Sequence, residues 1–308
     1  SGHDVRAANS TDDRASGLPL TGVPRRRGRL VPAREGASPA STDIGRPGTM
    51  VDDECRGRSK AVCDGCGRVF PRRDSIWRFL PDDRIEAHAA FLSRYVAVRS
   101  HEGWGKADAA YFRHLPYVSA SDPHAAIWNQ RARTYELLCD RVLVPMERAR
   151  GAHISVLDLG AGNCWLSARL AARGHAVVAL DLSDEGLDGL GTQAHYAREP
   201  ARGAIPFLAL QAEFDRVPFD DGQFDLVVFN ASLHYSSEYD ATLVEARRVL
   251  APHGRLVVMD TPLFRGAGAG DRMVRERDER FRGLCGLKVR TRARARPAMN
   301  GRATGRKP

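Results

Sequence analysis

Five short apolar runs, separated by stretches with helical spacing, constrain the fold of this chain more than any other feature. Each run is nearly continuously apolar, as parallel strands are when helices cover both faces of their sheet. The alternation therefore predicts an α/β fold with a doubly wound, mostly parallel sheet. The runs are ISVLDL (154–159), AVVALDL (176–182), IPFLALQ (205–211), FDLVVFN (224–230) and RLVVMD (255–260).

Helices are expected between the strands and before them. The segments with helical spacing between strands are 163–173, 184–198, a short one after 213, and 238–250. Two longer ones precede the first strand, at 84–99 and 124–150, and the second carries Ile127, Tyr135 and Leu138 on a partly buried face. A polar helix is expected over 271–283, with no strand after 260, so the sheet is predicted to be truncated after its fifth strand.

The domain organisation follows from composition. Residues 1–50 are rich in Gly, Pro, Ser and Arg and are expected to be a disordered leader, because the first Met is Met50. A small Cys-bearing element (51–83), a helical cap (84–150), the α/β domain (151–283) and a disordered basic tail (284–308) are expected to follow.

The formal net charge of +9 is concentrated at the ends of the chain. Residues 281–308 hold nine basic residues and no acid, whereas 51–280 hold 30 basic and 33 acidic residues. The body is therefore nearly neutral, and a nucleic-acid partner is disfavoured. No apolar run has the ~18–20 residues of a membrane span, and the six cysteines are scattered, so we expect a cytoplasmic protein without a membrane partner.

The turn after the first strand carries the strongest chemical signal. Gly160 and Gly162 stand between a strand and a helix, where glycine lets a ligand approach the backbone closely and the helix offers free N–H groups. Asp158 precedes the glycines, and Asp181 ends the next strand, where a carboxylate can accept both hydroxyls of a ribose. The pattern predicts a nucleotide-like ligand.

The residue after this turn distinguishes between two cofactors. A dinucleotide fingerprint has a third glycine where this chain has Trp165, which blocks the close helix–strand approach. Asp158 suits a cationic ligand, such as a sulfonium with its ammonium, better than a pyrophosphate. The sequence therefore favours S-adenosyl-L-methionine over NAD.

These motifs together resemble a known family. VLDLGAGNCWLSARLAARGHAVVALDLS (156–183) is similar to the first two motifs of class I S-adenosylmethionine-dependent methyltransferases of the type 11 group. QAEFDRVPFDDGQFDLVVFNASLHY (211–235) and EARRVLAPHGRLVVMD (245–260) resemble the motifs that follow in that family. The resemblance implies a Rossmann-like methyltransferase with S-adenosyl-L-methionine as cofactor.

The resemblance also implies roles for particular residues. The methionine end and the sulfur would be held around the first turn, the ribose and adenine at the second and third strands, and the pocket floor would follow the fourth strand. The residues implied are Asp158, Gly160, Ala161, Gly162, Asp181, Leu182, Ala212, Glu213, Asn230 and Ala231.

No shared catalytic residue can be carried over from the family, because a sulfonium methyl is already electrophilic. A general base is needed only for a protonated acceptor. His234 and Tyr235, just beyond the fourth strand, are the candidates, and Tyr111 is a candidate for covering the cofactor. Cys164 lacks an activating partner and is not expected to be a nucleophile.

The N-terminal cysteines suggest a degenerate half zinc ribbon. Cys63 and Cys66 form one C-x-x-C pair, but the second arm offers only Cys55, and neither His88 nor Asp64 has convincing spacing. We therefore expect no bound metal.

The leading prediction is a methyltransferase that acts by in-line displacement on an unidentified small-molecule acceptor. Two alternatives remain open. The chain binds the cofactor but is catalytically impaired because the C-terminal strands are missing, or it binds nucleic acid through its basic tail. An NAD enzyme ranks last, because of Trp165.

Overall fold

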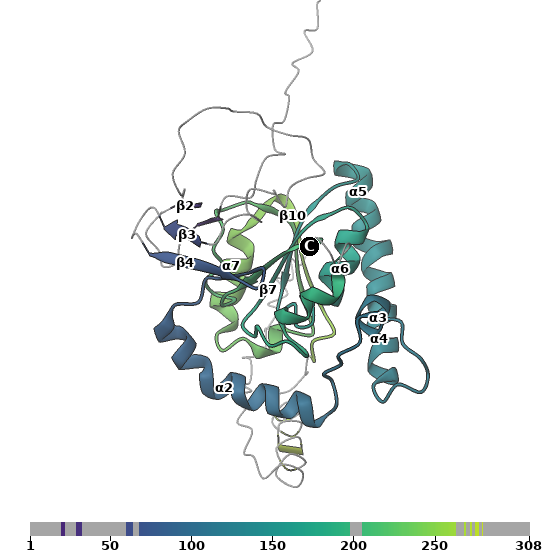
Figure 1. Ribbon diagram of the computed structural model, residues 1–308. Coiled ribbons are helices and arrows are strands. Elements are labelled where there is room, and N and C mark those ends of the chain that lie inside the picture. Colours follow the sequence, from purple (N-terminus) through teal and green to yellow (C-terminus); the bar gives the residue numbers. More distant parts are fainter. Residues whose placement is uncertain are drawn as a thin grey trace, which may run out of the picture.

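The computed structural model describes residues 68–197 and 205–262, the strand segments 20–21, 29–32 and 60–63, and single helical positions at 268, 272, 275, 276 and 279. These residues form one mixed sheet with the strand order β1-β2-β3-β4-β5-β8-β7-β6-β9-β10. Helices lie on both sides of its parallel part (Figure 1).

The five predicted strands are all present in the parallel part of the sheet. They are β6 (Ser155–Leu159), β7 (Ala176–Asp181), β8 (Leu208–Gln211), β9 (Phe224–Asn230) and β10 (Leu250–Met259). β8 is shorter than the predicted 205–211, and β10 begins earlier than predicted, with an irregularity in register between Leu250 and Arg255. The doubly wound, mostly parallel sheet is confirmed.

The topology of the sheet determines where a ligand can bind. β6 lies between β7 and β9, so the chain progresses to one side from β6 to β8 and then crosses to the other side. In a sheet of this kind, a crevice forms outside the carboxyl ends of the strands where the order reverses. The turn after β6 lies at this point.

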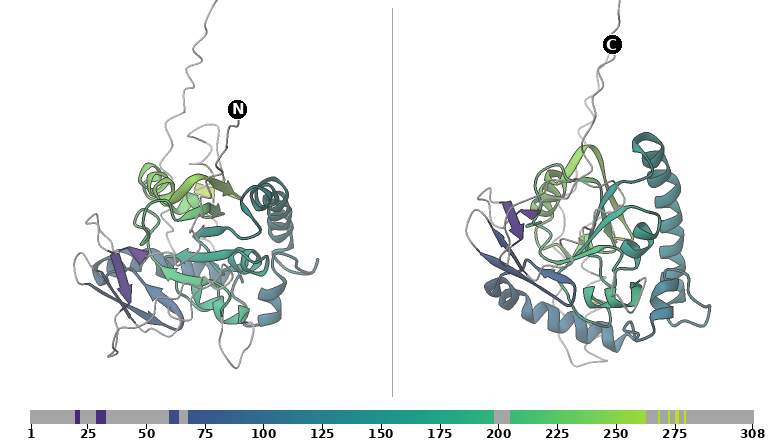
Figure 2. Two further views of the ribbon diagram at one scale, coloured as in Figure 1. Left: turned by 90° about the horizontal axis from the view of Figure 1, so that it is seen from above. Right: turned by 45° about the horizontal axis from the view of Figure 1, so that its top comes forward.

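Alternate residues of β6, β7, β8 and β9 point into two separate cores, as continuously apolar strands require. Val156 packs with α3, α4 and α6 on one face, whereas its neighbour Leu157 packs with α7 on the other. The further views also place these helices on opposite sides of the sheet (Figure 2). Both faces of β6 to β9 are therefore buried, whereas β10 is the last strand of the described sheet and is partly exposed, with Leu256 37% and Val258 38% exposed.

The helices around the strands match the prediction in part. α6 (Trp165–Ala172) and α7 (Tyr239–Arg248) lie where they were expected. The helix predicted over 184–198 is wrong in extent, because only the 3₁₀ helix η2 (Leu190–Tyr196) forms there. The Glu185 carboxylate accepts hydrogen bonds from the N–H groups of Leu187 and Asp188, and such local acceptors compete with a helix. The residues after 213 form a turn instead of the short helix expected.

The segment immediately before β6 is helical, as predicted. It contains α2 (Asp82–His101), α3 (Ala109–His114), α4 (Ala125–Leu138), the π-helical segment η1 (Cys139–Leu143) and α5 (Val144–Arg150). The buried face of α4 includes Trp128, Tyr135 and Leu138, whereas Ile127 is exposed, contrary to prediction. No helix among the described residues is long and apolar enough to cross a bilayer.

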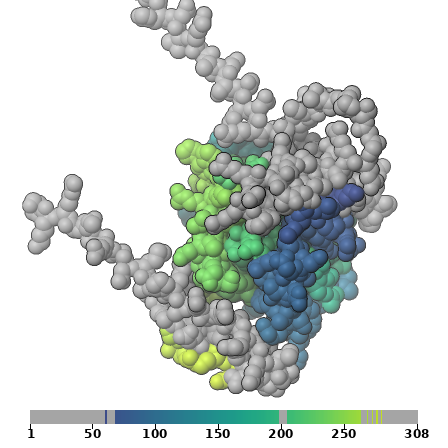
Figure 3. Space-filling model, turned by 90° about the vertical axis from the view of Figure 1, so that its left-hand side faces the viewer, coloured from purple at the N-terminus to yellow at the C-terminus, as the bar shows by residue number. Residues whose placement is uncertain are grey.

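The Cys-bearing element joins the main sheet. β3 (Lys60–Cys63), β4 (Val69–Arg73) and β5 (Ile76–Arg78) are antiparallel neighbours, and β5 then pairs in parallel with β8. In the space-filling view, the blue surface of this hairpin and α2 lies beside the green surface around α7 (Figure 3). The N-terminal hairpin thus widens the parallel sheet by one strand.

Two short strands interrupt the predicted disordered leader, since β1 (Leu20–Thr21) and β2 (Arg29–Pro32) continue the antiparallel edge. The rest of 1–50 and the whole predicted tail, 284–308, lie outside the described residues. Helical positions at 272, 275, 276 and 279 agree with the helix predicted over 271–283, whose other residues also lie outside them.

Candidate functional site

A cavity of about 170 Å³ lies at the carboxyl ends of β6, β7, β8 and β9. Nine of the ten residues that the family resemblance implies line it, and Asp158 does not. The structure thus brings together, in one cavity, residues from four strand ends that span more than 70 positions of the sequence. The nine are Gly160, Ala161, Gly162, Asp181, Leu182, Ala212, Glu213, Asn230 and Ala231.

The turn after β6 contains several residues in the left-handed backbone region. Gly160 and Gly162 have positive φ angles of 77° and 52°, and Cys164 at the start of α6 has a φ of 60°. A side chain at Gly160 would overlap the Cβ of Ser232, which follows β9. The N–H groups of Gly160 and Ala161 donate to the Leu180 carbonyl, at 2.8 and 3.1 Å, and tie the turn to β7.

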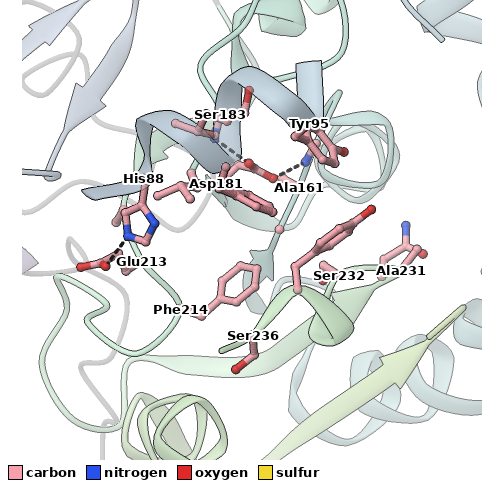
Figure 4. Close-up of a pocket in the computed structure, with 18 of the residues that line it drawn as sticks. His88, Tyr95, Ala161, Asp181, Ser183, Glu213, Phe214, Ala231, Ser232 and Ser236 are labelled. Carbon is pink, nitrogen blue, oxygen red and sulfur yellow. Dashed lines mark hydrogen bonds and ion pairs between the residues drawn. The ribbon is translucent and has the colours of Figure 1, made fainter. Parts of the chain in front are cut away.

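The Asp181 carboxylate lies at the centre of the strand ends. Its Oδ2 accepts a hydrogen bond from the Gly162 N–H at 2.8 Å, and its Oδ1 accepts one from the Ser183 N–H at 2.8 Å (Figure 4). Burial raises the pKa of Asp181, and these backbone hydrogen bonds oppose the rise. A carboxylate oxygen accepts more than one hydrogen bond, so both oxygens retain capacity for a ligand hydroxyl.

Asp158 lies beneath the turn rather than in the cavity wall. It is only 1% exposed, and its Oδ2 accepts a hydrogen bond from the Ser167 hydroxyl at 2.7 Å. Burial raises the pKa of Asp158 to about 7, and the Asp181 carboxylate adds to the rise. The structure therefore places Asp158 among buried residues behind the cavity lining, bonded to Ser167 of α6.

Helix α2 belongs largely to the segment predicted as a helical cap and forms a roof over the cavity, but its lining residues were not predicted. His88 and Tyr95 point from it into the space above Phe214 and Ser232 (Figure 4). The lining positions recur with helical spacing and form a basic and aromatic stripe, which is the signal that could have revealed this face. The lining residues of α2 are Arg84, His88, Phe91, Leu92, Tyr95 and Arg99.

Two carboxylates tie this roof to the strand ends. Glu213 accepts hydrogen bonds from Arg84 Nε at 3.1 and 3.2 Å and pairs with His88 Nε2 at 2.6 Å, and Arg99 forms an ion pair with Asp188. Burial tends to raise the pKa of Glu213, but the bonds from Arg84 and His88 outweigh it and hold that pKa below its ordinary value. Glu213 thus binds α2 as well as lining the cavity.

The floor of the cavity is formed by residues at the carboxyl end of β9. Asn230, Ala231 and Ser232 line it, and the Ala231 N–H donates to the Met259 carbonyl of β10 at 2.9 Å. The Tyr235 ring meets Tyr95 of α2 edge-on, with ring centroids 5.6 Å apart. An aromatic contact therefore joins the roof of the cavity to its floor.

The two candidate bases differ in position. Tyr235 lines the cavity, whereas His234, its neighbour in the short helix η3 (Leu233–Tyr235), does not. The structure therefore places only one of the two at the cavity wall.

Two other residues considered in the sequence analysis, Tyr111 and Cys164, do not line the cavity. The Tyr111 hydroxyl, expected to cover the cofactor, accepts a hydrogen bond from Trp128 Nε1 at 3.0 Å and does not line the cavity. Cys164 is fully buried, and burial raises the pKa of its thiol well above the ordinary value, which disfavours the reactive thiolate.

The half zinc ribbon stays a prediction. Cys55 and Cys66 lie outside the described residues. Within the part of the chain that the structure describes, no group of three His, Cys, Asp or Glu side chains is arranged to hold a metal ion.

Comparisons with known proteins agree with this geometry. Residues 157–258, about a third of the chain, match the model of the family described as "Methyltransferase domain". The match begins within β6 and ends within β10, so it contains the turn, Asp181 and the strand ends that form the cavity. The predicted resemblance to S-adenosylmethionine-dependent methyltransferases is thereby confirmed over these residues.

Curated relatives share the same part of the chain. The malonyl-[acyl-carrier protein] O-methyltransferase of Erwinia pyrifoliae is 34% identical over 134 residues, 43% of this chain and 46% of the relative. The demethylmenaquinone methyltransferase of Beutenbergia cavernae is 38% identical over 151 residues, 45% of this chain and 59% of the relative. The chain thus spans about half the length of the curated relatives it matches.

Among solved structures, the chain is similar to an S-adenosylmethionine-dependent methyltransferase from Mesorhizobium loti. The two are 26% identical with a TM-score of 0.30, and the match covers 37% of this chain and 50% of that one.

Proposed function

We propose that this protein is an S-adenosyl-L-methionine-dependent methyltransferase that acts on a small-molecule acceptor. The observation that carries the proposal is the hydrogen bond between the Gly162 N–H and the Asp181 carboxylate, at the wall of a cavity formed by four strand ends. This arrangement offers bare backbone and a hydroxyl-binding carboxylate side by side. The family match over 157–258 supports the same conclusion.

The residues of the cavity suit the nucleoside end of the cofactor at β7 and β8. Asp181 would hold the ribose hydroxyls, because both of its oxygens retain acceptor capacity. Leu182 and Ala212 would flank the adenine, and Glu213 would meet its edge. Since Glu213 is also bound to α2, cofactor binding and closure of the roof would be coupled.

The turn and the floor suit the methionine end. Gly160, Ala161 and Gly162 would form the cradle, because a Cβ at Gly160 has no room. Asn230 and Ala231 would line the floor, and the buried Asp158 would favour the cationic end of the ligand from below.

The bound cofactor supplies an electrophilic methyl group on a sulfonium, and transfer to the acceptor is an in-line displacement. The chain's own residues then have to align the acceptor and exclude water, which can lower a barrier by on the order of 7–11 kcal/mol. The roof formed by α2 and the contact between Tyr95 and Tyr235 would exclude water. Tyr235, rather than His234, would contact the acceptor, since it lines the cavity.

The acceptor itself stays unassigned. The two curated relatives are named for different acceptors, a malonyl group on a carrier protein and demethylmenaquinone. We assign the cofactor to the predicted domain 151–283 and the roof to the predicted helical cap 84–150. The scattered cysteines support a cytoplasmic location as part of the same proposal.

Calorimetric titration with S-adenosyl-L-methionine tests the proposal. We expect saturable binding to the wild-type protein and a loss of about tenfold or more in affinity in Asp181→Ala, since hydrogen bonds to a charged group are worth about 1.5–3 kcal/mol. Asp184→Ala is the matched control, because that carboxylate is 45% exposed and pairs with Arg78. Absence of binding to the wild-type protein, or unchanged affinity in Asp181→Ala, contradicts the proposal.

Activity is tested separately by release of S-adenosylhomocysteine with a panel of small acceptors. Methyl transfer is supported if this release depends on the acceptor and is reduced in Tyr235→Phe. Binding without release across the panel favours the alternative of a cofactor-binding chain without turnover.

A further inference from the structure

Three arginines line the cavity, and two of them already have carboxylate partners. Arg84 pairs with Glu213, and Arg99 pairs with Asp188. The third, Arg131 on α4, forms no ion pair or side-chain hydrogen bond among the described residues. The cavity therefore contains one guanidinium whose five donors have no protein acceptor in the described part of the chain.

Arg131 is held in place by aromatic rings. Its guanidinium lies over the Trp128 ring at 4.7 Å from the centroid and 5.6 Å from that of Trp104. Trp128 is fully buried and Trp104 is 5% exposed, so the rings belong to the core. Stacking orients a guanidinium but leaves the N–H groups at its edge free to bind an acceptor.

Asp260, an acidic residue that acts electrostatically on Arg131, is engaged with other residues of the same helix. Asp260, just after β10, accepts hydrogen bonds from Thr134 at 2.8 Å and from Gln130 at 3.4 Å. These bonds fix α4 against the end of β10. They hold the helix on both sides of Arg131 in the sequence, while the rings of Trp104 and Trp128 contact its guanidinium.

Arg131 is half-buried, and its loss of hydration favours an anionic ligand. Burial lowers the pKa of Arg131, and the neighbouring Arg99 lowers it further. A charged group removed from water needs a partner of opposite charge to offset the loss of hydration. A planar guanidinium binds a carboxylate with two parallel hydrogen bonds, and a group with a single negative charge suits a site that Asp188 and Asp260 also face.

We propose that Arg131 is a carboxylate-binding residue of this cavity. The carboxylate has two sources under the proposed function, on which this identification of the ligand rests: the amino-acid end of S-adenosyl-L-methionine, or an acidic group on the acceptor. Both would bind at the α4 side of the cavity, near Trp165, whose ring meets that of Trp128 edge-on at 6.0 Å.

Three variants separate charge from packing. Arg131→Met keeps an apolar stem against the two tryptophans and removes the charge, whereas Arg131→Lys keeps the charge and removes the planar fork. Arg133→Met is the matched control, because Arg133 is exposed on the same helix. Circular dichroism and thermal unfolding check that each variant folds. If Arg131→Met does not fold, Arg131→Lys provides the test.

The first arm measures binding of S-adenosylhomocysteine and of 5′-methylthioadenosine, which has the same nucleoside and sulfur but no amino acid. If Arg131 binds the carboxylate of the cofactor, Arg131→Met weakens binding of S-adenosylhomocysteine by about 10- to 100-fold and changes that of methylthioadenosine by less than twofold. Arg131→Lys gives an intermediate loss, and Arg133→Met gives none.

The second arm uses hexanoate and its neutral isostere hexanamide, with and without saturating S-adenosylhomocysteine. If the acceptor supplies the carboxylate, the saturated wild-type protein binds hexanoate more tightly than hexanamide, and Arg131→Met removes that preference. If the wild-type protein binds neither nucleoside ligand, the proposed function fails, and preference for hexanoate that depends on Arg131 still supports the carboxylate site. The inference is overturned if Arg131→Met changes the affinity for neither S-adenosylhomocysteine nor hexanoate.

Discussion

The backbone N–H of Gly162 donates a hydrogen bond to Oδ2 of Asp181, at 2.8 Å, and so joins the turn after β6 to the end of β7. The turn and the carboxylate are therefore fixed relative to each other before any ligand binds. A second oxygen of the same carboxylate is fixed by the Ser183 N–H. Pre-organisation of this kind reduces the cost of ordering a site when its ligand binds.

Asp158 predicts a specific dependence of stability on pH. Its pKa is raised to about 7 by burial, whereas an unfolded aspartate titrates at about 3.9. Between about pH 4 and pH 7, the folded chain retains a proton that the unfolded chain has released, so the stability due to this group is lost as pH rises.

Asp158→Asn removes this titration. We expect the free energy of unfolding of the variant, relative to wild type, to rise by a few kcal/mol from pH 4 to pH 7, at about 1.4 kcal/mol for each unit of pKa shift. Urea denaturation of both proteins without ligand, in matched buffers, measures the difference. A difference that stays constant over this range contradicts the pKa shift of Asp158.

Glu213→Gln is expected to loosen α2. The substitution removes the charge that pairs with Arg84 and His88, and α2 has no buried residue of its own to hold it. Hydrogen exchange in residues 82–101 should become several-fold faster, and affinity for S-adenosylhomocysteine should fall. Glu86→Gln, an exposed position on the same helix, is the control and should leave both quantities unchanged.

The pKa of Glu213 adds a pH dependence to the same contact. Because Arg84 and His88 hold this pKa below its ordinary value, the stabilisation is present above the unfolded pKa and is lost as pH falls through the folded one. Lower protection of α2 amides, after correction for the intrinsic exchange rate at each pH, should therefore appear on acidification in the wild-type protein. Glu213→Gln should not show this change.

Gly160→Ala is expected to disrupt the turn. The residue has a φ of 77°, and an added Cβ would overlap Ser232, whose hydroxyl donates to the Leu159 carbonyl. Overpacking in a close contact costs about 1–3 kcal/mol, so thermal unfolding should occur several degrees lower, with weaker cofactor binding. At Gly186 an added Cβ meets no atom within 4 Å, so equal effects from Gly186→Ala would count against this explanation.

Tyr111→Phe distinguishes packing from cofactor contact. The substitution leaves the indole N–H of the fully buried Trp128 without its acceptor, which costs about 1–3 kcal/mol. Chemical denaturation should detect this loss, while affinity for S-adenosylhomocysteine stays within twofold. Tyr117→Phe, at an exposed position, is the control. A selective loss of cofactor affinity would instead support the predicted covering role of Tyr111.

The strands and the turn could be predicted because their signals are local. Val156, Leu157 and Leu159 are apolar around the single charged Asp158, and Gly160 and Gly162 follow within three residues. The helix over 184–198 failed for an equally local reason, since the side chains of Ser183 and Glu185 accept hydrogen bonds from nearby backbone N–H groups. Helical periodicity does not register such competition.

The lining face of α2 was not predicted, because apolar periodicity does not mark it. Helix α2 was expected as a helix, but none of its residues is buried, so no continuous apolar stripe marked the face that turns toward the strand ends. Arg131 was hidden for a similar reason. Its surroundings, Trp104 and Trp128, come from positions 27 and 3 residues earlier in the sequence, and only tertiary packing brings all three together.

The pairing of β5 with β8 affects the order in which the chain can assemble. Ile76 lies opposite Ala209, so β5 leaves the ribosome about 130 residues before its partner strand. Contacts this distant in sequence form late and slowly, because a long loop has to close first. Until then, the buried faces of Trp77 and Phe79 lack their partners. The cavity also includes residues at the end of β9, so competence to bind ligand arrives only when translation has passed that strand.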